Sequence, residues 1–180
     1  LAHGDPGGSR FNELARLWTE AGHRVTVIAG TVNYATGKSI PGCSGQVTRV
    51  EEEGIEVYRC RVPETYNSGF LGRMWAFFGF TWSSTLGVLR APQPDVIVAT
   101  SPPLTTGLTG WLAALWHRRP WLFEIRDLWP ESAVTTGVLP ERGLLTRALY
   151  RLERFCCRKA DAINVLTPAF ADDIVSRGLA

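Results

Sequence analysis

Apolar and polar residues alternate along the chain with two periods, and these periods predict helices and strands in turn. Residues 9–21 have apolar residues at helical spacing, so we expect a helix that Ser9 caps and Gly22 ends. Its inner face is expected to carry Phe11, Leu14, Trp18 and Ala21. The β-branched segment 24–30 predicts a short strand directly after this helix.

The middle of the chain changes pattern three times. Residues 31–46 contain Gly, Pro, Asn and Ser without periodicity and predict a loop. Residues 47–62 predict two strands that turn near Glu53-Gly54. Residues 70–89 form a long, mainly apolar segment and predict a long helix.

The helix over 70–89 is about as long as a bilayer is thick and holds one charge, Arg73. Gly, Ser and Thr dilute its apolar character, and an α/β domain needs a buried helix here. We therefore expect a core helix rather than a membrane span. Its aromatic residues are either buried in the core or form an edge that dips into a membrane surface. The edge consists of Phe70, Trp75, Phe78 and Trp82.

The second half of the chain alternates more plainly between strands and helices. Strands are predicted over 95–100, 120–125 and 161–167. Helices are predicted over 101–119, 143–160 and 168–179. This order predicts an α/β fold, a Rossmann-like, doubly wound and mostly parallel sheet with helices on both faces. The chain begins in a loop and ends before an expected strand, so we expect one domain, 1–180, truncated at both ends.

Composition excludes some classes of protein. A net charge of +2 over 180 residues, with no run of Lys or Arg, argues against a nucleic-acid binder. The cysteines lack metal-binding spacing, so we predict no metal site and inert thiols. With no signal peptide visible, the expected compartment is the cytoplasm. The cysteines are Cys43, Cys60, Cys156 and Cys157.

Polar residues follow a predicted buried strand in the segment FEIRDLWPESA. Arg126 and Asp127 come directly after the apolar run, and Glu131 follows four residues later. In parallel sheets, ligands bind outside the carboxyl ends of the strands. Asp127 lies at such an end, and so do Ser101 and Thr167. The sequence therefore predicts a binding edge formed by these side chains.

Each of these residues also has a structural interpretation that the sequence leaves open. Arg126 and Asp127 could form a salt bridge that closes the loop, and Glu131 could brace the loop instead of contacting a ligand. Ser101 and Thr167 are each suited to cap the helix that follows.

Gly7 and Gly8 precede the first predicted helix. Backbone N–H groups at a helix start bind anions, so this loop is a candidate phosphate site. The alternative is an ordinary tight turn, because no GxGxxG pattern is present.

Five segments of the chain, taken in order, carry a resemblance to a known family. They are DPGGSRFNELARLWTEAGHRVTVIAG, NYATGK, PDVIVATSPPL, FEIRDLWPESA and ADAINVLT. Together they resemble the N-terminal, acceptor-side half of a family 4 glycosyltransferase with the GT-B fold. The nearest branch is that of bacterial enzymes that build cell-surface polysaccharides. The resemblance runs from Pro6 to Gly178.

The resemblance implies a two-lobed enzyme that moves a sugar from a nucleotide diphosphate sugar to an acceptor, with retention at the anomeric carbon. It implies no metal and no cofactor, and the nucleotide is not specified. The expected acceptor is a polyprenyl-diphosphate-linked saccharide at the inner membrane surface, so a cytoplasmic, peripheral location is expected. The C-terminal nucleotide-sugar lobe is not included in these residues, so the fragment alone is expected to be inactive.

The resemblance also implies roles for particular residues. Gly7 and Gly8 would lie near the donor diphosphate, Asp127 would accept or orient the acceptor hydroxyl, and Arg126 would hold phosphate charge. Many relatives carry His-Asp where this chain has Arg126-Asp127, which excludes a histidine base here.

Two rival functions remain. One is a non-catalytic, membrane-recruiting subunit of a split glycosyltransferase. The other is a dinucleotide-binding oxidoreductase domain, against which the missing glycine fingerprint and missing ribose-binding acid argue.

Overall fold

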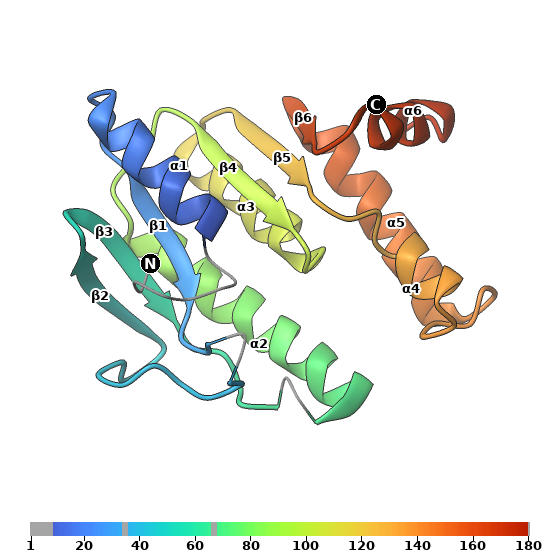
Figure 1. The fold of residues 1–180 in the computed structure, drawn as a ribbon, viewed down its shortest axis with the longest axis horizontal. Coiled ribbons are helices and arrows are strands. Elements are labelled where there is room, and N and C mark those ends of the chain that lie inside the picture. The colour runs from blue at the N-terminus through green and yellow to red at the C-terminus, as the bar shows by residue number, and fades with distance from the viewer. Residues whose placement is uncertain (1–8, 34–35, 66–67, 180) are drawn as a thin grey trace. The chain divides into compact units, whose positions relative to one another are not determined.

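The computed structural model describes residues 9–33, 36–65 and 68–179. The chain divides into two compact units, Leu1–Pro92 and Gln93–Ala180. Each unit is built around a three-stranded sheet (Figure 1). Among the described residues, three of the four strand pairings are parallel, and helices flank both sheets. The predicted α/β class with a mostly parallel arrangement is confirmed.

The described part of the first unit contains two helices and three strands. These are α1 (Ser9–Glu20), β1 (Thr26–Gly30), β2 (Val47–Glu52), β3 (Ile55–Cys60) and α2 (Gly69–Arg90). The strand order is β1-β3-β2, with β1 parallel and β2 antiparallel to β3. Glu53 and Gly54 form the two-residue turn between β2 and β3, with φ of 54° and 76°. Positive φ at both positions matches the twist of a hairpin, so the predicted turn is confirmed.

Successive strand residues point to opposite faces of this first sheet, so each face can pack against a helix of its own. On one face, Val57 of β3 packs in a cluster with Ala15 of α1. On the other face, Cys60 lies beneath α2 at Gly87. A Cβ added to Gly87 would come within 2.7 Å of the Cys60 sulfur, so glycine permits this close approach.

Helix α1 ends in a hydrogen-bonded turn at glycine, as predicted. Gly22 has φ of 88°, its N–H donates to Thr19 O at 3.0 Å, and the His23 N–H donates to Trp18 O at 2.9 Å. These two bonds satisfy carbonyls that the helix end leaves open. The predicted inner face was wrong in part, because Trp18 and Ala21 are exposed and Ala15 is the buried contact. Periodicity shows which side is apolar, not how much of it the sheet covers.

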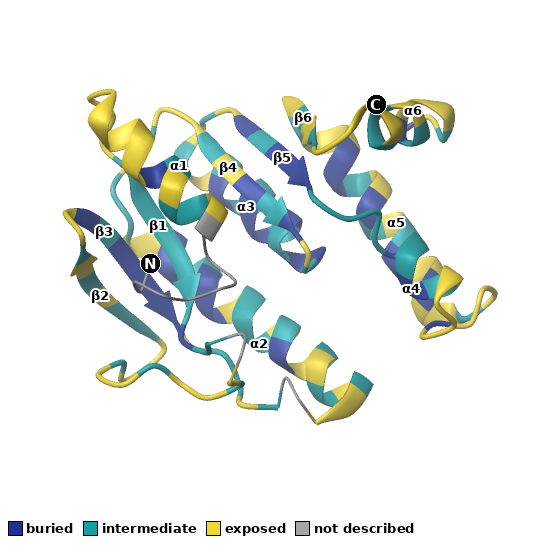
Figure 2. Cartoon of the chain, in the orientation of Figure 1, coloured by how far each residue is buried: buried dark blue, intermediate teal, exposed yellow. Residues whose placement is uncertain are grey.

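Helix α2 places small residues toward the sheet and large aromatic residues outward. Ser83 and Ser84 are buried, and the Ser83 hydroxyl donates to Arg61 O at 2.7 Å. Figure 2 shows buried and exposed residues alternating along this helix. The outward side chains are Leu71, Trp75, Phe78, Trp82 and Leu89. Phe70, which was assigned to the aromatic edge, is half-buried. None of the described helices is long and apolar enough to cross a membrane.

The second unit contains three parallel strands and four helices. These are β4 (Ile97–Ser101), α3 (Thr105–His117), β5 (Trp121–Ile125), α4 (Glu131–Thr135), α5 (Leu144–Lys159), β6 (Ala162–Val165) and α6 (Pro168–Ser176). The strand order is β4-β5-β6. The largest core cluster includes Trp121 and Phe123 of β5 with Cys156 of α5. Burial raises the pKa of the Cys156 thiol to about 12, which makes this sulfur unreactive.

The prediction that Ser101 caps a helix is wrong. Ser101 is the buried last residue of β4, and α3 begins at Thr105 with Leu104 at the cap position. The reason is the pair Pro102-Pro103, because a residue before proline is disfavoured in the helical region. The predicted cap at Thr167 is confirmed, since its hydroxyl accepts from the Phe170 N–H at 3.3 Å.

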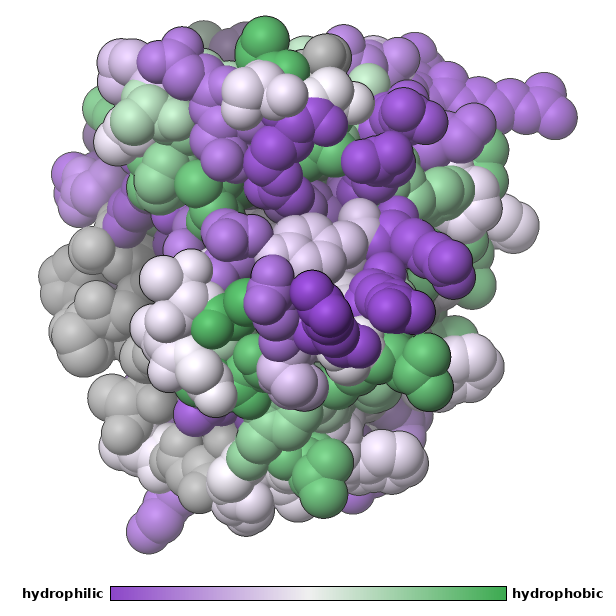
Figure 3. Space-filling model, turned by 90° about the vertical axis from the view of Figure 1, so that its right-hand side faces the viewer, coloured by the Kyte–Doolittle hydropathy of each residue, from purple (hydrophilic) through white to green (hydrophobic). Residues whose placement is uncertain are grey.

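Helix α5, predicted over 143–160, is amphipathic, with Leu149 and Cys156 buried. Its exposed side carries Arg147, Arg151, Arg154 and Arg158. Figure 3 shows one face of the molecule, on which hydrophilic side chains are mixed with hydrophobic ones. Two deviations appear: Leu145 is exposed, and Glu153 is buried.

Gly110 provides a test of core packing in the second unit. A Cβ there would lie 2.5 Å from Ala99 Cβ and 2.9 Å from Trp121 Cε3. Helix propensity alone would favour Gly110→Ala by about 1 kcal/mol. We expect overpacking to prevail and to lower the free energy of unfolding by about 1–3 kcal/mol in urea titrations. The exposed control Leu115→Ala should change it by less than about 0.5 kcal/mol. A Gly110→Ala chain as stable as the parent would contradict the packing described.

Candidate functional site

The carboxyl ends of the second sheet bring the predicted edge residues together. Ser101, Ile125 and Val165 lie opposite one another in the strand register. Arg126 and Asp127 follow Ile125, and Thr167 closely follows Val165, so these residues extend from one edge. The Arg126 N–H donates to Ser101 O at 3.1 Å, which holds the loop after β5 against the end of β4.

Asp127 lies half-buried in the turn that leaves this edge. Its backbone carbonyl accepts from the Trp129 N–H at 2.8 Å, and its Oδ2 accepts from the Ser132 hydroxyl at 3.2 Å. A serine hydroxyl therefore holds the Asp127 carboxylate where the chain leaves this edge. Asp127 is oriented by its own loop.

Glu131 is the first residue of α4 and contacts the neighbouring helix α5. The Tyr150 hydroxyl donates to Glu131 Oε2. Burial and this hydrogen bond raise the pKa of Tyr150 to about 12, so the phenol keeps its proton at neutral pH. Of the two roles predicted for Glu131, the structure shows the brace; its contact with a ligand stays a prediction.

Tyr150 in turn contacts Arg177, whose partner Glu153 is buried. The Arg177 guanidinium lies 5.7 Å from the centre of the Tyr150 ring. It pairs with Glu153 and, at 3.0 Å, with Asp173. Burial raises the pKa of Glu153, and the ion pair with Arg177 opposes this effect. The contacts thus connect α4, α5 and α6.

A second polar group lies one position before the strand ends. Glu124 is almost fully buried and accepts hydrogen bonds from the Thr100 hydroxyl and the Asn164 amide, both at 3.1 Å. These three residues are in register across β4, β5 and β6. Sequence reasoning missed Glu124, although an acid within an apolar strand was a visible signal. It also missed Ser132 and Tyr150, whose contacts have no local signature.

Gly7 and Gly8, the predicted phosphate-binding residues, lie outside the described residues.

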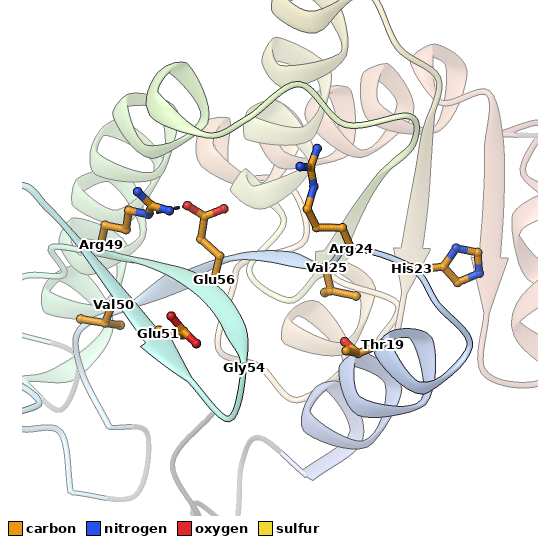
Figure 4. A pocket seen from close by; sticks show the side chains of 9 residues that line it. All are labelled: Thr19, His23, Arg24, Val25, Arg49, Val50, Glu51, Gly54 and Glu56. Carbon is orange, nitrogen blue, oxygen red and sulfur yellow. Dashed lines mark ion pairs between the residues drawn. The ribbon is translucent and has the colours of Figure 1, made fainter.

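A pocket of about 510 Å³ lies in the first unit at the amino end of β1 and the β2–β3 turn (Figure 4). Arg49 and Glu56 form an ion pair there. This is the end of β1 opposite to the one where α/β sheets bind ligands. The described residues contain no His, Cys, Asp and Glu group suited to a metal ion.

Parallel strands, helices on the sheet faces and polar side chains beyond the carboxyl ends define a Rossmann-like α/β domain. The family model of the glycosyl transferase 4-like domain matches residues 7–180. The chain belongs to this family, and glycosyl transfer with a nucleotide-sugar donor is the general activity the family implies. A search of the curated proteins found no match.

The ion pair between buried Glu153 and half-buried Arg177 predicts a pH-dependent stability. Because its folded-state pKa is raised, Glu153 contributes stability below its ordinary pKa and loses it as pH rises. Arg177→Leu removes the opposing charge, so this loss should grow. We expect destabilisation of roughly 3 kcal/mol at about pH 7.5 and a smaller deficit at about pH 5 in denaturant titrations.

A matched control for this prediction is Arg16→Leu. Arg16 pairs with Glu13 at an exposed site, so its loss should cost less than about 1 kcal/mol at either pH. An equal deficit for Arg177→Leu at both pH values would show that Glu153 does not respond to its partner.

Proposed function

We propose that the chain is the acceptor-side lobe of a retaining glycosyltransferase that acts in cell-surface polysaccharide synthesis. The observation that carries this proposal is Asp127, held by Ser132 at the carboxyl edge of a parallel sheet in a glycosyl transferase 4-like domain. A carboxylate at such an edge can bind the hydroxyl of an incoming sugar. The resemblance to bacterial polysaccharide enzymes supports the choice of branch.

In the proposed reaction, the acceptor hydroxyl donates its hydrogen bond to Asp127. The hydroxyl oxygen forms a bond to the anomeric carbon of the donor sugar on the face from which the diphosphate departs. The bond from that carbon to the diphosphate oxygen breaks, so the anomeric configuration is retained. Asp127 takes the hydroxyl proton, and the nucleoside diphosphate leaves with the bonding electron pair. Arg126 is the proposed partner of phosphate charge, because guanidinium groups bind phosphate oxygens bidentately.

The other roles follow from the same arrangement. Gly7 and Gly8 are proposed to bind the donor diphosphate with backbone N–H groups. The nucleotide itself is proposed to bind mainly to a C-terminal lobe that lies outside these residues, so this chain alone is expected to be inactive. No metal or cofactor takes part in the proposed reaction.

A lipid-linked acceptor would bring the protein to a membrane surface. The exposed side of α2 supports this proposal, because Trp75, Phe78 and Trp82 are 65%, 59% and 66% exposed on one helix face. Aromatic side chains suit the interface between lipid and water. Arg73 and Arg90 are also exposed, and each adds about 1 kcal/mol of attraction to anionic lipids near the surface. The proposed location is the cytoplasmic face of the inner membrane.

A non-catalytic recruiting subunit of a split transferase would use the same α2 surface. The two functions differ at Asp127, which a recruiting subunit does not need.

We expect Asp127→Asn to abolish sugar transfer while the fold persists, because the amide cannot take the proton. The measurement is transfer of radiolabel from UDP- or GDP-sugars to a polyprenyl-diphosphate sugar by the protein that carries this domain. Asp172→Asn, an exposed acid-to-amide change on α6, is the control and should keep full activity. Near-normal turnover of Asp127→Asn would sink the catalytic assignment and leave the recruiting subunit as the better interpretation.

We expect the double variant Trp75→Ser and Phe78→Ser to lose binding to anionic vesicles while its melting temperature changes little. The reason is that both side chains are exposed and contribute little to the core. Co-sedimentation and thermal melts are measured on the same samples. The control replaces Leu115 and Trp116, which are exposed apolar residues of α3, with serine. A collapsed melt, or unchanged vesicle binding, would refute docking through α2.

A further inference from the structure

We propose that Ser132 and Tyr150 are positioning residues for the acceptor-side chemistry, with Ser132 orienting the Asp127 carboxylate and Tyr150 holding the helix that carries Ser132. This inference rests on the proposed function, because it assigns an action through Asp127. Neither residue is proposed to touch a substrate.

The first step is the contact between Ser132 and Asp127. The serine hydroxyl donates to Oδ2 at 3.2 Å, which restricts rotation of the carboxylate. Within the described residues, Oδ1 is then the oxygen that remains for a substrate hydroxyl. A carboxylate that has lost this contact would sample other rotamers, and small misplacements of reacting groups slow catalysis strongly.

The second step concerns the short helix α4, from Glu131 to Thr135. A helix of five residues is unstable alone and depends on tertiary contacts. One contact is the buried methyl group of Ala133, and another is the hydrogen bond from Tyr150 to Glu131. Because Glu131 directly precedes Ser132, movement at Glu131 displaces the hydroxyl that holds Asp127.

The third step concerns Tyr150 itself, which is fixed from its other side. The Arg177 guanidinium packs over its ring, and Arg177 is anchored by the buried Glu153. With its pKa raised to about 12, the Tyr150 hydroxyl remains a donor to Glu131 throughout the neutral range. The tyrosine is therefore a permanent brace and not a group that exchanges protons in the reaction.

The test measures kcat, donor KM and thermal stability in the protein that carries this domain. Radiolabelled UDP- or GDP-sugars serve as donors and a polyprenyl-diphosphate sugar as acceptor. We expect Ser132→Ala and Tyr150→Phe each to lower kcat about tenfold and to leave donor KM within about twofold. Ser132→Thr keeps the hydroxyl and should restore most of the activity.

Two controls remove the same groups elsewhere. Thr85→Ala deletes a hydroxyl from α2 that donates to the helix backbone at Thr81 O. Tyr58→Phe deletes a phenol that donates to Glu56 in the first unit, as Tyr150 does to Glu131. Both controls should keep kcat within about twofold of the parent, because neither contact reaches Asp127.

The outcomes separate this inference from the proposed function. If Asp127→Asn is inactive while Ser132→Ala and Tyr150→Phe behave like their controls, the positioning roles are overturned and the catalytic assignment stands. If Asp127→Asn retains activity, the proposed function itself fails. A loss of kcat in Ser132→Ala or Tyr150→Phe that is explained by a smaller folded fraction also overturns the inference. So does a Ser132→Thr variant that loses as much kcat as Ser132→Ala.

Discussion

The register of β4, β5 and β6 is the constraint on which the candidate site depends. Parallel strands that start and stop in register bring the residues after Ser101, Ile125 and Val165 to one edge. A shift of one position would turn each side chain to the opposite face of the sheet. The loop that carries Asp127 leaves this edge, and the backbone bond between Arg126 and Ser101 keeps it there. The position of Asp127, on which the catalytic proposal rests, therefore depends on strand pairing.

Local signals in the sequence accounted for much of the fold. The change from helical to alternating periodicity located the elements, and the Glu53-Gly54 and Thr167-Pro168 pairs marked a turn and a helix start that the structure confirms. The cap rule failed at Ser101 because the two prolines after it have a stronger influence on the backbone than its hydroxyl has. These successes and this failure all involve interactions within a few residues.

Contacts between distant segments explain what the sequence did not reveal. Tyr150 reaches Glu131 across 19 positions, and Arg177 reaches Glu153 across 24. No local pattern in the sequence indicates that Glu153 is buried or that Arg177 is its partner. Similarly, the composition of α2 showed an apolar helix without showing that serines face the sheet and tryptophans face outward. That choice depends on how closely a helix must approach the strands beneath it.

The hydrogen-bonded row of Thr100, Glu124 and Asn164 has a consequence for how the chain selects its native pairing. A shift in register would separate the buried Glu124 carboxyl group from the Thr100 hydroxyl and the Asn164 amide, at a cost of a few kcal/mol. One buried glutamate in an apolar sheet thus disfavours strand pairings with the wrong register while the chain folds.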